Sequence, residues 1–155
     1  MSKHDELLKK DPWTFDQDEQ NGWRALDNDG KYLEAARLIE KYLAANLEGV
    51  KKFRKYPNMD KLMFFHAGQL YATEGTEYYQ EAIKHFKKAY RDDREDWNIY
   101  IDATIAFLNA DQNELKKQLK QLNALEESGT QTNAGVVQRL LDRLQAGNPS
   151  YKDAY

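Results

Sequence analysis

Apolar residues recur at spacings of three and four along most of this chain, a pattern that predicts amphipathic α-helices. The pattern is clearest in residues 64–90, where Gly75 separates two such segments. The apolar face of the first segment consists of Phe64, Ala67, Gly68 and Tyr71, and that of the second of Tyr78, Ala82, Phe86 and Ala89. Because both faces combine small and large residues, we expect the two helices to pack closely as an antiparallel hairpin.

Residues 75–89 contain Gly followed by Tyr-x-x-x-Ala-x-x-x-Phe-x-x-Ala, and residues 30–36 begin a similar run without insertion. These two runs resemble the turn and second helix of the tetratricopeptide repeat, a helical hairpin that recurs about every 34 residues. The chain departs from the family in spacing, since the equivalent alanines, Ala35 and Ala82, lie 47 residues apart. The resemblance covers about residues 20–125.

The resemblance implies an all-α fold of about three antiparallel helix hairpins, stacked as a short right-handed tetratricopeptide-like array and closed by a C-terminal capping helix. The first pair is expected at 16–28 and from 31 onward, the second within 64–90, the third at 95–110 and 112–127, and the capping helix at 133–146.

Residues 47–59 are the surplus over the family's period. The preferred interpretation extends the preceding helix to Tyr56, where Pro57 stops it, and an irregular loop is the alternative. Residues 1–15 are predicted to be a lead-in, in which Trp13 and Phe15 cap the open end of the first pair. Residues 16–146 then form a single helical domain, and residues 147–155 a flexible tail.

The composition of the chain limits the classes of protein to which it can belong. The chain has 155 residues, 23 basic and 26 acidic side chains, a net charge of −3 and no cysteine. Disulfides, thiolate zinc sites and thiol nucleophiles are therefore excluded. No apolar run approaches the roughly 20 residues of a membrane span, and the polar start lacks the apolar core of a signal peptide. We expect a cytoplasmic protein without a membrane segment.

Motifs for catalysis or metal binding are missing from the sequence. The acidic turn at residues 27–30 does not match a calcium-binding loop, because alanines stand at the first and last ligand positions. His4, His66 and His85 do not form a zinc motif, and no residue at a suitable sequence spacing would orient a catalytic histidine. His85 is expected to face solvent. The sequence predicts a non-enzyme without a metal or cofactor.

The resemblance also implies a partner-binding groove, because the first helix of each pair lines the concave face of such arrays. The groove-facing positions are Gln20, Arg24 and Asp27 in the first pair, Phe65, Gln69 and Ala72 in the second, and Asn98, Ile101, Ile105 and Leu108 in the third. Only Arg24 supplies a cation and only Asn98 an asparagine. A clamp for a peptide's C-terminal carboxylate is therefore not expected.

One concentrated basic segment carries interleaved aromatic residues. It consists of Lys51, Lys52, Phe53, Arg54, Lys55 and Tyr56. The preferred interpretation is that cations at a helix C-terminus complement the helix dipole. Contact with an acidic protein partner ranks second, and contact with nucleic acid ranks last because the chain is acidic as a whole.

These expectations together favour a non-catalytic protein–protein interaction module that binds one protein partner through the groove or the basic segment. A cognate inhibitor, such as an immunity protein bound to a basic toxin, is one form of this hypothesis. A secretion-type chaperone with a secreted client is the alternative. An RNA-contacting regulator and an enzyme with an unrecognised site are the hypotheses of a different class, and the oligomeric state stays open.

Overall fold

The computed structural model describes residues 2–125 and 132–154, and within those ranges it contains helices and turns but no strand. The all-α prediction is confirmed for this part of the chain. The helices are α1 (Lys3–Leu7), α2 (Pro12–Gln17), α3 (Arg24–Asn28), α4 (Tyr32–Lys51), α5 (Met59–Glu74), η1 (Thr76–Tyr78), α6 (Tyr79–Lys87), α7 (Glu95–Leu108), α8 (Gln112–Leu125), α9 (Thr132–Gln145) and η2 (Lys152–Ala154).

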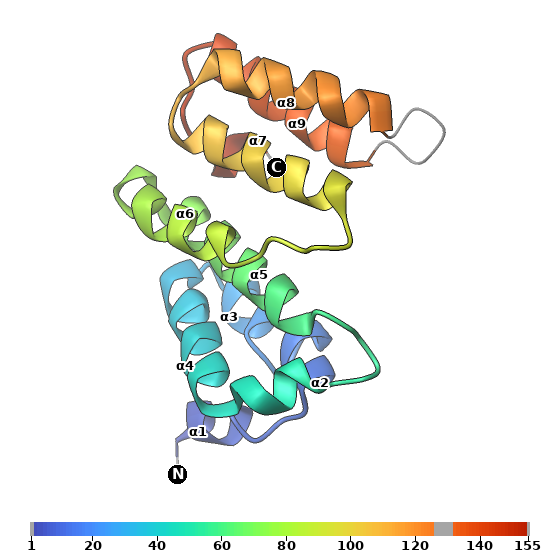
Figure 1. Ribbon diagram of the computed structural model, residues 1–155. Coiled ribbons are helices and arrows are strands. Elements are labelled where there is room, and N and C mark those ends of the chain that lie inside the picture. Colours follow the sequence, from blue (N-terminus) through green and yellow to red (C-terminus); the bar gives the residue numbers. More distant parts are fainter. Residues whose placement is uncertain (1, 126–131, 155) are drawn as a thin grey trace.

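Helices that follow each other in sequence pack against each other in space. Figure 1 shows α1–α4 at one end of the molecule, α7–α9 at the other, and α5 and α6 between them. The closest pairs are α4 with α5, α5 with α6, and α7 with α8, and α9 packs on both α7 and α8. The contact of α6 with α7 is much smaller than that of α6 with α5. One apolar core nevertheless runs through all of these elements.

The α5–α6 pair packs as its sequence predicts. Ala67, Ala82 and Phe86 are fully buried at its centre. A Cβ atom on Gly68 would lie 2.7 Å from the Phe86 ring, so only glycine lets the two helices approach this closely. Small residues on one helix thus make room for the aromatic ring of the other.

The first predicted pair is wrong in its first helix. Residues 16–28 are not one helix: α2 ends at Gln17, residues 18–23 turn the chain, and α3 has only five residues. The turn into α4 is where the sequence places it, at Gly30, whose φ of +76° favours glycine. In the predicted turn before α8, Ala110 takes the positive φ, while the side chain of Asp111 accepts the backbone N–H of Glu114.

The long helix α4 extends less far than predicted. It runs to Lys51, and residues 52–58 form a loop instead of the helical extension to Tyr56. Asn46 lies at a kink, with φ at −129°, and its side-chain amide donates to the carbonyl oxygens of Leu8 and Tyr42 at 3.1 Å each. The hydrogen bond to Leu8 attaches the N-terminal segment to α4 at this kink.

The two aromatic residues of the lead-in have different environments. Phe15 is fully buried and stacks on Tyr42 with ring centroids 3.9 Å apart. Trp13 is 46% exposed. The predicted capping role therefore fits Phe15 and not Trp13.

The C-terminal segment packs on the body, although the sequence predicts a flexible tail for residues 147–155. Tyr151 is only 2% exposed and lies against Phe107, with ring centroids 6.3 Å apart. Its backbone N–H donates to the Tyr79 hydroxyl at 2.9 Å, and this hydroxyl donates to the carbonyl oxygen of Pro149. The Gln69 amide donates to the Tyr151 hydroxyl at 3.3 Å. Residues 148–154 thus connect α5 and α6 to α7.

Other predicted boundaries agree within a few residues. The third pair is observed as α7 and α8, although the predicted end at Glu127 lies outside the described residues, as does most of the predicted 128–133 link. The last helix begins at Thr132, one residue before the predicted N-cap. None of the helices in the described ranges is long and apolar enough to cross a membrane.

Two glycine substitutions test the packing of the N-terminal turn. A Cβ atom on Gly22 would lie 1.8 Å from the carbonyl oxygen of Phe15, whereas one on Gly49 in α4 would meet nothing within 4 Å. We expect Gly22→Ala to lower the free energy of unfolding by about 2 kcal/mol or more, because backbone must move to accept the methyl group. Gly49→Ala should raise it by about 0.5 kcal/mol through helix propensity. Urea denaturation of both variants checks this, and a Gly22→Ala protein as stable as wild type would contradict the observed turn.

The packing of the C-terminal segment gives a second prediction. Tyr151→Ala should lower the free energy of unfolding by about 3 kcal/mol, because a buried aromatic side chain leaves a cavity. It should also expose the bond after Lys152 to trypsin under native conditions. Ser150→Ala is the control in the same segment, because the Ser150 side chain forms no hydrogen bond among the described residues. Equal proteolysis of the two variants would show that Tyr151 does not hold the segment in place.

Candidate functional site

The structure does not bring the predicted groove residues together on one open face. Phe65 is 5% exposed and packs among Phe86, Trp97 and Tyr100, with ring centroids 4.7 to 5.5 Å away. Ile101 is 0% exposed. These two side chains are core residues in this structure, and neither is available to a partner.

Asn98 holds the connection between α6 and α7. Its side-chain oxygen accepts the backbone N–H of Arg91 at 2.8 Å, and its amide donates to the Arg91 carbonyl at 2.6 Å. These two hydrogen bonds satisfy the backbone N–H and carbonyl of Arg91 in the loop before α7. The polar atoms of Asn98 are therefore already used within the chain.

The remaining groove candidates come from the first two helix pairs. Asp27 on α3 and Gln69 on α5 line one small pocket together with His66 and Tyr151. Arg24 lies beside it, with its guanidinium carbon 4.5 Å above the Trp23 ring and its Nε donating to the backbone carbonyl of Asp16 at 2.7 Å. Gln20 is exposed in the turn before α3. Two of the predicted groove residues, Asp27 and Gln69, thus line one compact polar site.

A buried carboxylate organises this site. Asp16 is fully buried at the end of α2, and its Oδ1 accepts the indole N–H of Trp23 at 3.0 Å. The same oxygen lies 3.0 Å from Nδ1 of His66 on α5, and Oδ2 accepts the Gln17 amide at 2.6 Å. Because an ionised carboxylate only accepts hydrogen bonds, Nδ1 of His66 carries the proton and donates. His66 is therefore oriented by a residue 50 positions away.

The electrostatics of Asp16 follow from these contacts. Burial opposes its ionisation, but the positive charge that His66 carries when protonated and the hydrogen bonds of His66, Trp23 and Gln17 outweigh burial and hold the pKa of Asp16 below its usual 3.8. By contrast, burial raises the pKa of Asp27, against the opposing influence of Arg24. The two carboxylates differ because Asp16 has hydrogen-bond donors and Asp27 has none among the described residues.

His85 holds three helices together. His85 is buried, which corrects the expectation that it faces solvent. Its Nδ1 is 2.8 Å from the carbonyl oxygen of Glu81, and its Nε2 is 2.9 Å from a carboxylate oxygen of Glu40, which also accepts the Tyr71 hydroxyl at 2.7 Å. The contact of Nδ1 lies within α6, whereas Nε2 and the Tyr71 hydroxyl meet at Glu40 and so join α4, α5 and α6.

A second candidate site lies at the far end of α4. We use the name basic–aromatic surface for Trp13, Phe53 and Tyr56 together with the cations Lys51, Lys52, Arg54 and Lys55. The rings of Trp13 and Tyr56 are tilted against each other, with centroids 5.8 Å apart. A hollow of about 640 Å³ opens here, lined by Asp11, Trp13, Thr14, Phe53 and Lys55. It is broad enough to accept side chains of a partner.

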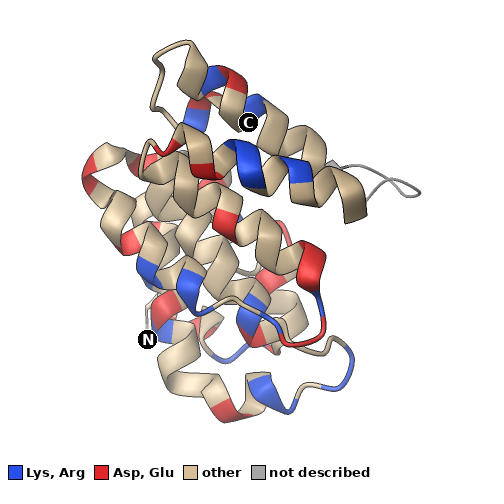
Figure 2. Cartoon of the chain, turned by 45° about the horizontal axis from the view of Figure 1, so that its top comes forward, with Lys and Arg blue, Asp and Glu red and all other residues tan. Residues whose placement is uncertain are grey.

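The cations of the basic–aromatic surface are not neutralised by the chain itself. Figure 2 shows Lys and Arg gathered at the end of α4 and in the loop that follows. All four are exposed, and within the described ranges none of them lies within 4 Å of a carboxylate in an ion pair. Lys51 ends α4 and fits the predicted dipole role, but Arg54 and Lys55 lie beyond the helix.

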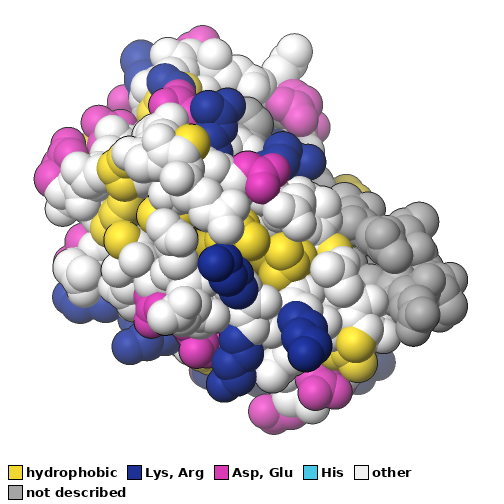
Figure 3. Space-filling view, turned by 90° about the horizontal axis from the view of Figure 1, so that it is seen from above, with side chains coloured by type: hydrophobic (Ala, Val, Ile, Leu, Met, Phe, Trp, Pro, Cys, Tyr) yellow, Lys and Arg dark blue, Asp and Glu magenta, His cyan; other side chains and the backbone are white. Residues whose placement is uncertain are grey.

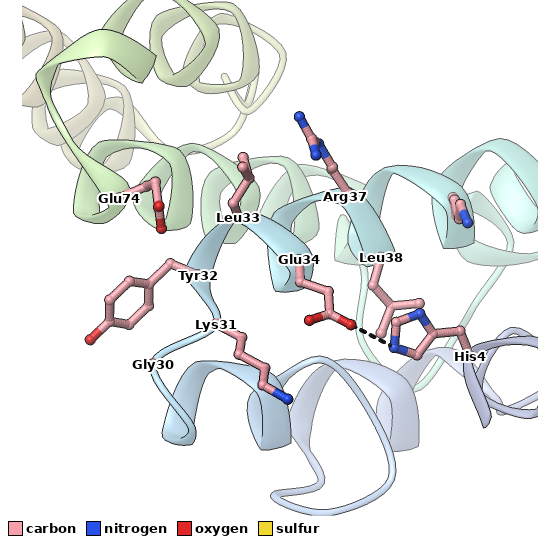
Figure 4. A pocket seen from close by; sticks show the side chains of 10 residues that line it. His4, Gly30, Lys31, Tyr32, Leu33, Glu34, Arg37, Leu38 and Glu74 are labelled. Atoms are coloured by element: carbon pink, nitrogen blue, oxygen red, sulfur yellow. Dashed lines mark ion pairs between the residues drawn. The ribbon is translucent and has the colours of Figure 1, made fainter.

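A third hollow, of about 450 Å³, lies where α1 meets the start of α4. Figure 4 shows His4 directed toward Glu34, with its Nε2 3.2 Å from a carboxylate oxygen, and Lys31, Arg37 and Glu74 around the same opening. Because charges of both signs face this hollow, it favours neither an anion nor a cation. We assign it no binding role.

The end of the molecule formed by α8 and α9 carries a band of apolar side chains with Lys and Arg around it (Figure 3). Leu125 is 47% exposed at the end of α8. It adjoins residues 126–131, which lie outside the described part of the chain. Nothing in the structure shows what covers this band.

Comparisons with models of protein families, with curated proteins and with solved structures returned no match. Among residues 2–125 and 132–154, no group of three or more His, Cys, Asp or Glu side chains is placed to hold a metal ion.

Sequence spacing could not have found the main features of these sites. The pairing of Asp16 with His66 joins α2 to α5, and neither residue belongs to a short motif. Tyr151 lies in a polar stretch typical of a tail. The signal for the basic–aromatic surface was present in residues 51–56, but the contribution of Trp13 depends on how α2 folds back.

The buried Asp16 makes the stability of the fold dependent on pH. Its folded-state pKa lies below the unfolded value, so ionised Asp16 stabilises the fold fully above about pH 4, and the stabilisation is lost as the pH falls through the folded pKa. We expect Asp16→Asn to lower the free energy of unfolding at neutral pH by about 3 kcal/mol, because a neutral amide replaces the ionised acceptor of the His66, Trp23 and Gln17 hydrogen bonds.

The same variant should lose part of the acid dependence of stability below about pH 4. Urea denaturation of wild type, Asp16→Asn and Asp29→Asn between neutral and acidic pH measures both effects. Asp29→Asn is the control, because Asp29 is exposed in the turn after α3. If Asp16→Asn shows the same acid dependence as Asp29→Asn, the proposed charge state of Asp16 is wrong.

Proposed function

We propose that this protein is a non-catalytic binding module for one protein partner, and that an acidic segment of the partner docks on the basic–aromatic surface. The observation that carries the proposal is the exposure of Trp13, at 46%, beside four cations that have no ion-pair partner in the described part of the chain. Tryptophan, tyrosine and arginine are enriched among the residues that contribute most binding energy at protein interfaces, and cations with no partner in the chain are free to pair with carboxylates of a partner.

The shape of the surface fits such a segment. Trp13 and Phe53 form apolar walls of the hollow, and Lys55 lies at its edge. An apolar side chain of the partner would cover these walls, while neighbouring carboxylates would pair with the exposed cations. Apolar burial then supplies affinity, and the charge pairs select an acidic partner and speed association.

A protein partner is favoured over nucleic acid. The carboxylate of Asp11 lines the same hollow and would repel a phosphate backbone. The chain as a whole carries 26 acidic and 23 basic side chains, so it offers no long positive track. The cations are confined to residues 51–55, which suits a short acidic peptide segment.

The scaffold we propose for this module is a tetratricopeptide-like array, with α3–α4, α5–α6 and α7–α8 as its hairpins and α9 as its cap. The close Gly68–Phe86 contact and the glycine turn before α4 support it. A cognate inhibitor, such as an immunity protein, is the preferred form, and a secretion-type chaperone is the alternative. An inhibitor holds a folded partner, whereas a chaperone holds an extended and protease-sensitive one.

Affinity capture with matched variants tests the proposed surface. We expect Trp13→Ala to weaken binding of a stoichiometric partner by about 2 kcal/mol, because an interface anchor is removed. Lys52→Glu/Lys55→Glu should abolish binding by charge reversal. Lys116→Glu/Lys117→Glu on α8 reverses the same charges at exposed positions elsewhere and is the control. Quantitative mass spectrometry of the captured proteins, followed by titration of the purified partner at increasing salt, measures these effects.

The outcomes separate the hypotheses. A partner that is lost with both surface variants and retained with the α8 control supports the proposal. A partner retained by all variants would move the interface to another face. Capture that is abolished by nuclease treatment would favour the RNA-contacting alternative instead.

A further inference from the structure

A small pocket lies between α3, α5 and the C-terminal segment, away from the hollow of the basic–aromatic surface. Its volume is about 190 Å³, and Asp27, His66, Gln69, Thr73 and Tyr151 contribute its polar lining. This is below the usual range of pockets for whole ligands, about 300–1,000 Å³, and matches a single side chain or a compact ion.

The His66 imidazole lines this pocket and is held in one orientation by Asp16. Its Nδ1 donates to the buried carboxylate of Asp16 at 3.0 Å, as described above. In the neutral ring Nε2 then carries the lone pair, and no hydrogen bond to Nε2 occurs within the described residues. Asp16 therefore acts as a positioning residue, which holds the ring and selects its tautomer.

Asp27 is an unpaired carboxylate in the same pocket. It is only partly accessible, and among the described residues it forms neither an ion pair within 4 Å nor a side-chain hydrogen bond. Arg24 is close enough to influence it, but the Arg24 guanidinium lies over the Trp23 ring and donates to the backbone of Asp16. A partly buried carboxylate without a partner costs free energy that a bound cation would recover.

Thr73 and Gln69, which also line the pocket, have acceptor oxygens that no hydrogen bond among the described residues uses. The hydroxyl of Thr73 donates its proton to the carbonyl of Gln69 at 2.7 Å, which leaves its oxygen able to accept. The amide nitrogen of Gln69 donates to Tyr151, so its side-chain oxygen is the remaining polar atom. A pocket of acceptors around one negative charge repels anions and selects a positively charged donor.

We propose that this pocket binds one organic cation, a primary ammonium or guanidinium group, with the Asp27 carboxylate as its counter-ion and His66 Nε2 as a second acceptor. The group comes from a free amine or guanidine compound or from a basic side chain of a protein partner, since both present the same chemistry. A metal ion does not fit, because His66 and Asp27 supply only two ligands of the usual type.

The experiment uses the full-length protein and defined probes. Methylguanidinium chloride and n-butylammonium chloride are titrated against the isotope-labelled protein while the His66 ring and the Trp23 indole resonances are followed. We expect saturable shifts with both probes and none with tetramethylammonium chloride, which has the charge but no N–H donor. A short Gly-Arg-Gly peptide blocked at both ends distinguishes the sources: tighter binding than methylguanidinium indicates a partner's side chain, and weaker binding indicates a free compound.

Matched variants decide whether Asp27 is the counter-ion. Asp27→Asn should weaken binding at least about tenfold, as expected for the loss of a charge-assisted bond. It should not lower the midpoint of thermal unfolding, because Asp27 has no partner to lose in the described structure. Asp29→Asn makes the same change at an exposed position two residues away and should bind as wild type. Equal affinity of the two variants, or equal shifts with tetramethylammonium, would overturn the proposal.

Discussion

The buried carboxylate of Asp16 is the interaction on which the N-terminal half of the molecule depends. A charge removed from water requires several donors, and these come from three places: Gln17 beside it, Trp23 before α3 and His66 on α5. Meeting this requirement fixes the short helices α2 and α3 against the longer pair behind them. The N-terminal segment therefore has a definite position although its helices α1, α2 and α3 are short.

Contacts between neighbouring helices could be predicted from the spacing of residues in the sequence, whereas contacts between distant segments could not. The approach of Gly68 to Phe86 is encoded by residues on adjacent helices with regular spacing, so the α5–α6 hairpin could be predicted in detail. The pairing of Asp16 with His66 has no periodic signature, because it depends on how α2 meets α5. The burial of Tyr151 depends on its contacts with α5, α6 and α7, and the polar sequence of the tail does not predict these contacts.

The residues of the candidate sites could likewise be predicted only in part. Asp27 and Gln69 were assigned to one groove by analogy with a repeat, and the structure does place them around one pocket. Phe65 and Ile101 were assigned by the same analogy, but a small rotation of a helix about its axis exchanges groove and core positions. Because both residues are buried, the analogy with a repeat predicted the position of the helices better than the direction of each side chain.

The docked C-terminal segment also bears on the order in which the chain folds. The Gln69–Tyr151 hydrogen bond joins residues 82 positions apart, and all of α7, α8 and α9 lie between them. Closing so long a loop costs entropy that is recovered only after the intervening helices have formed. We therefore expect the helix pairs to assemble first and residues 148–154 to dock last. Since the same segment borders the Asp27–His66 pocket, the pocket is complete only at the end of folding.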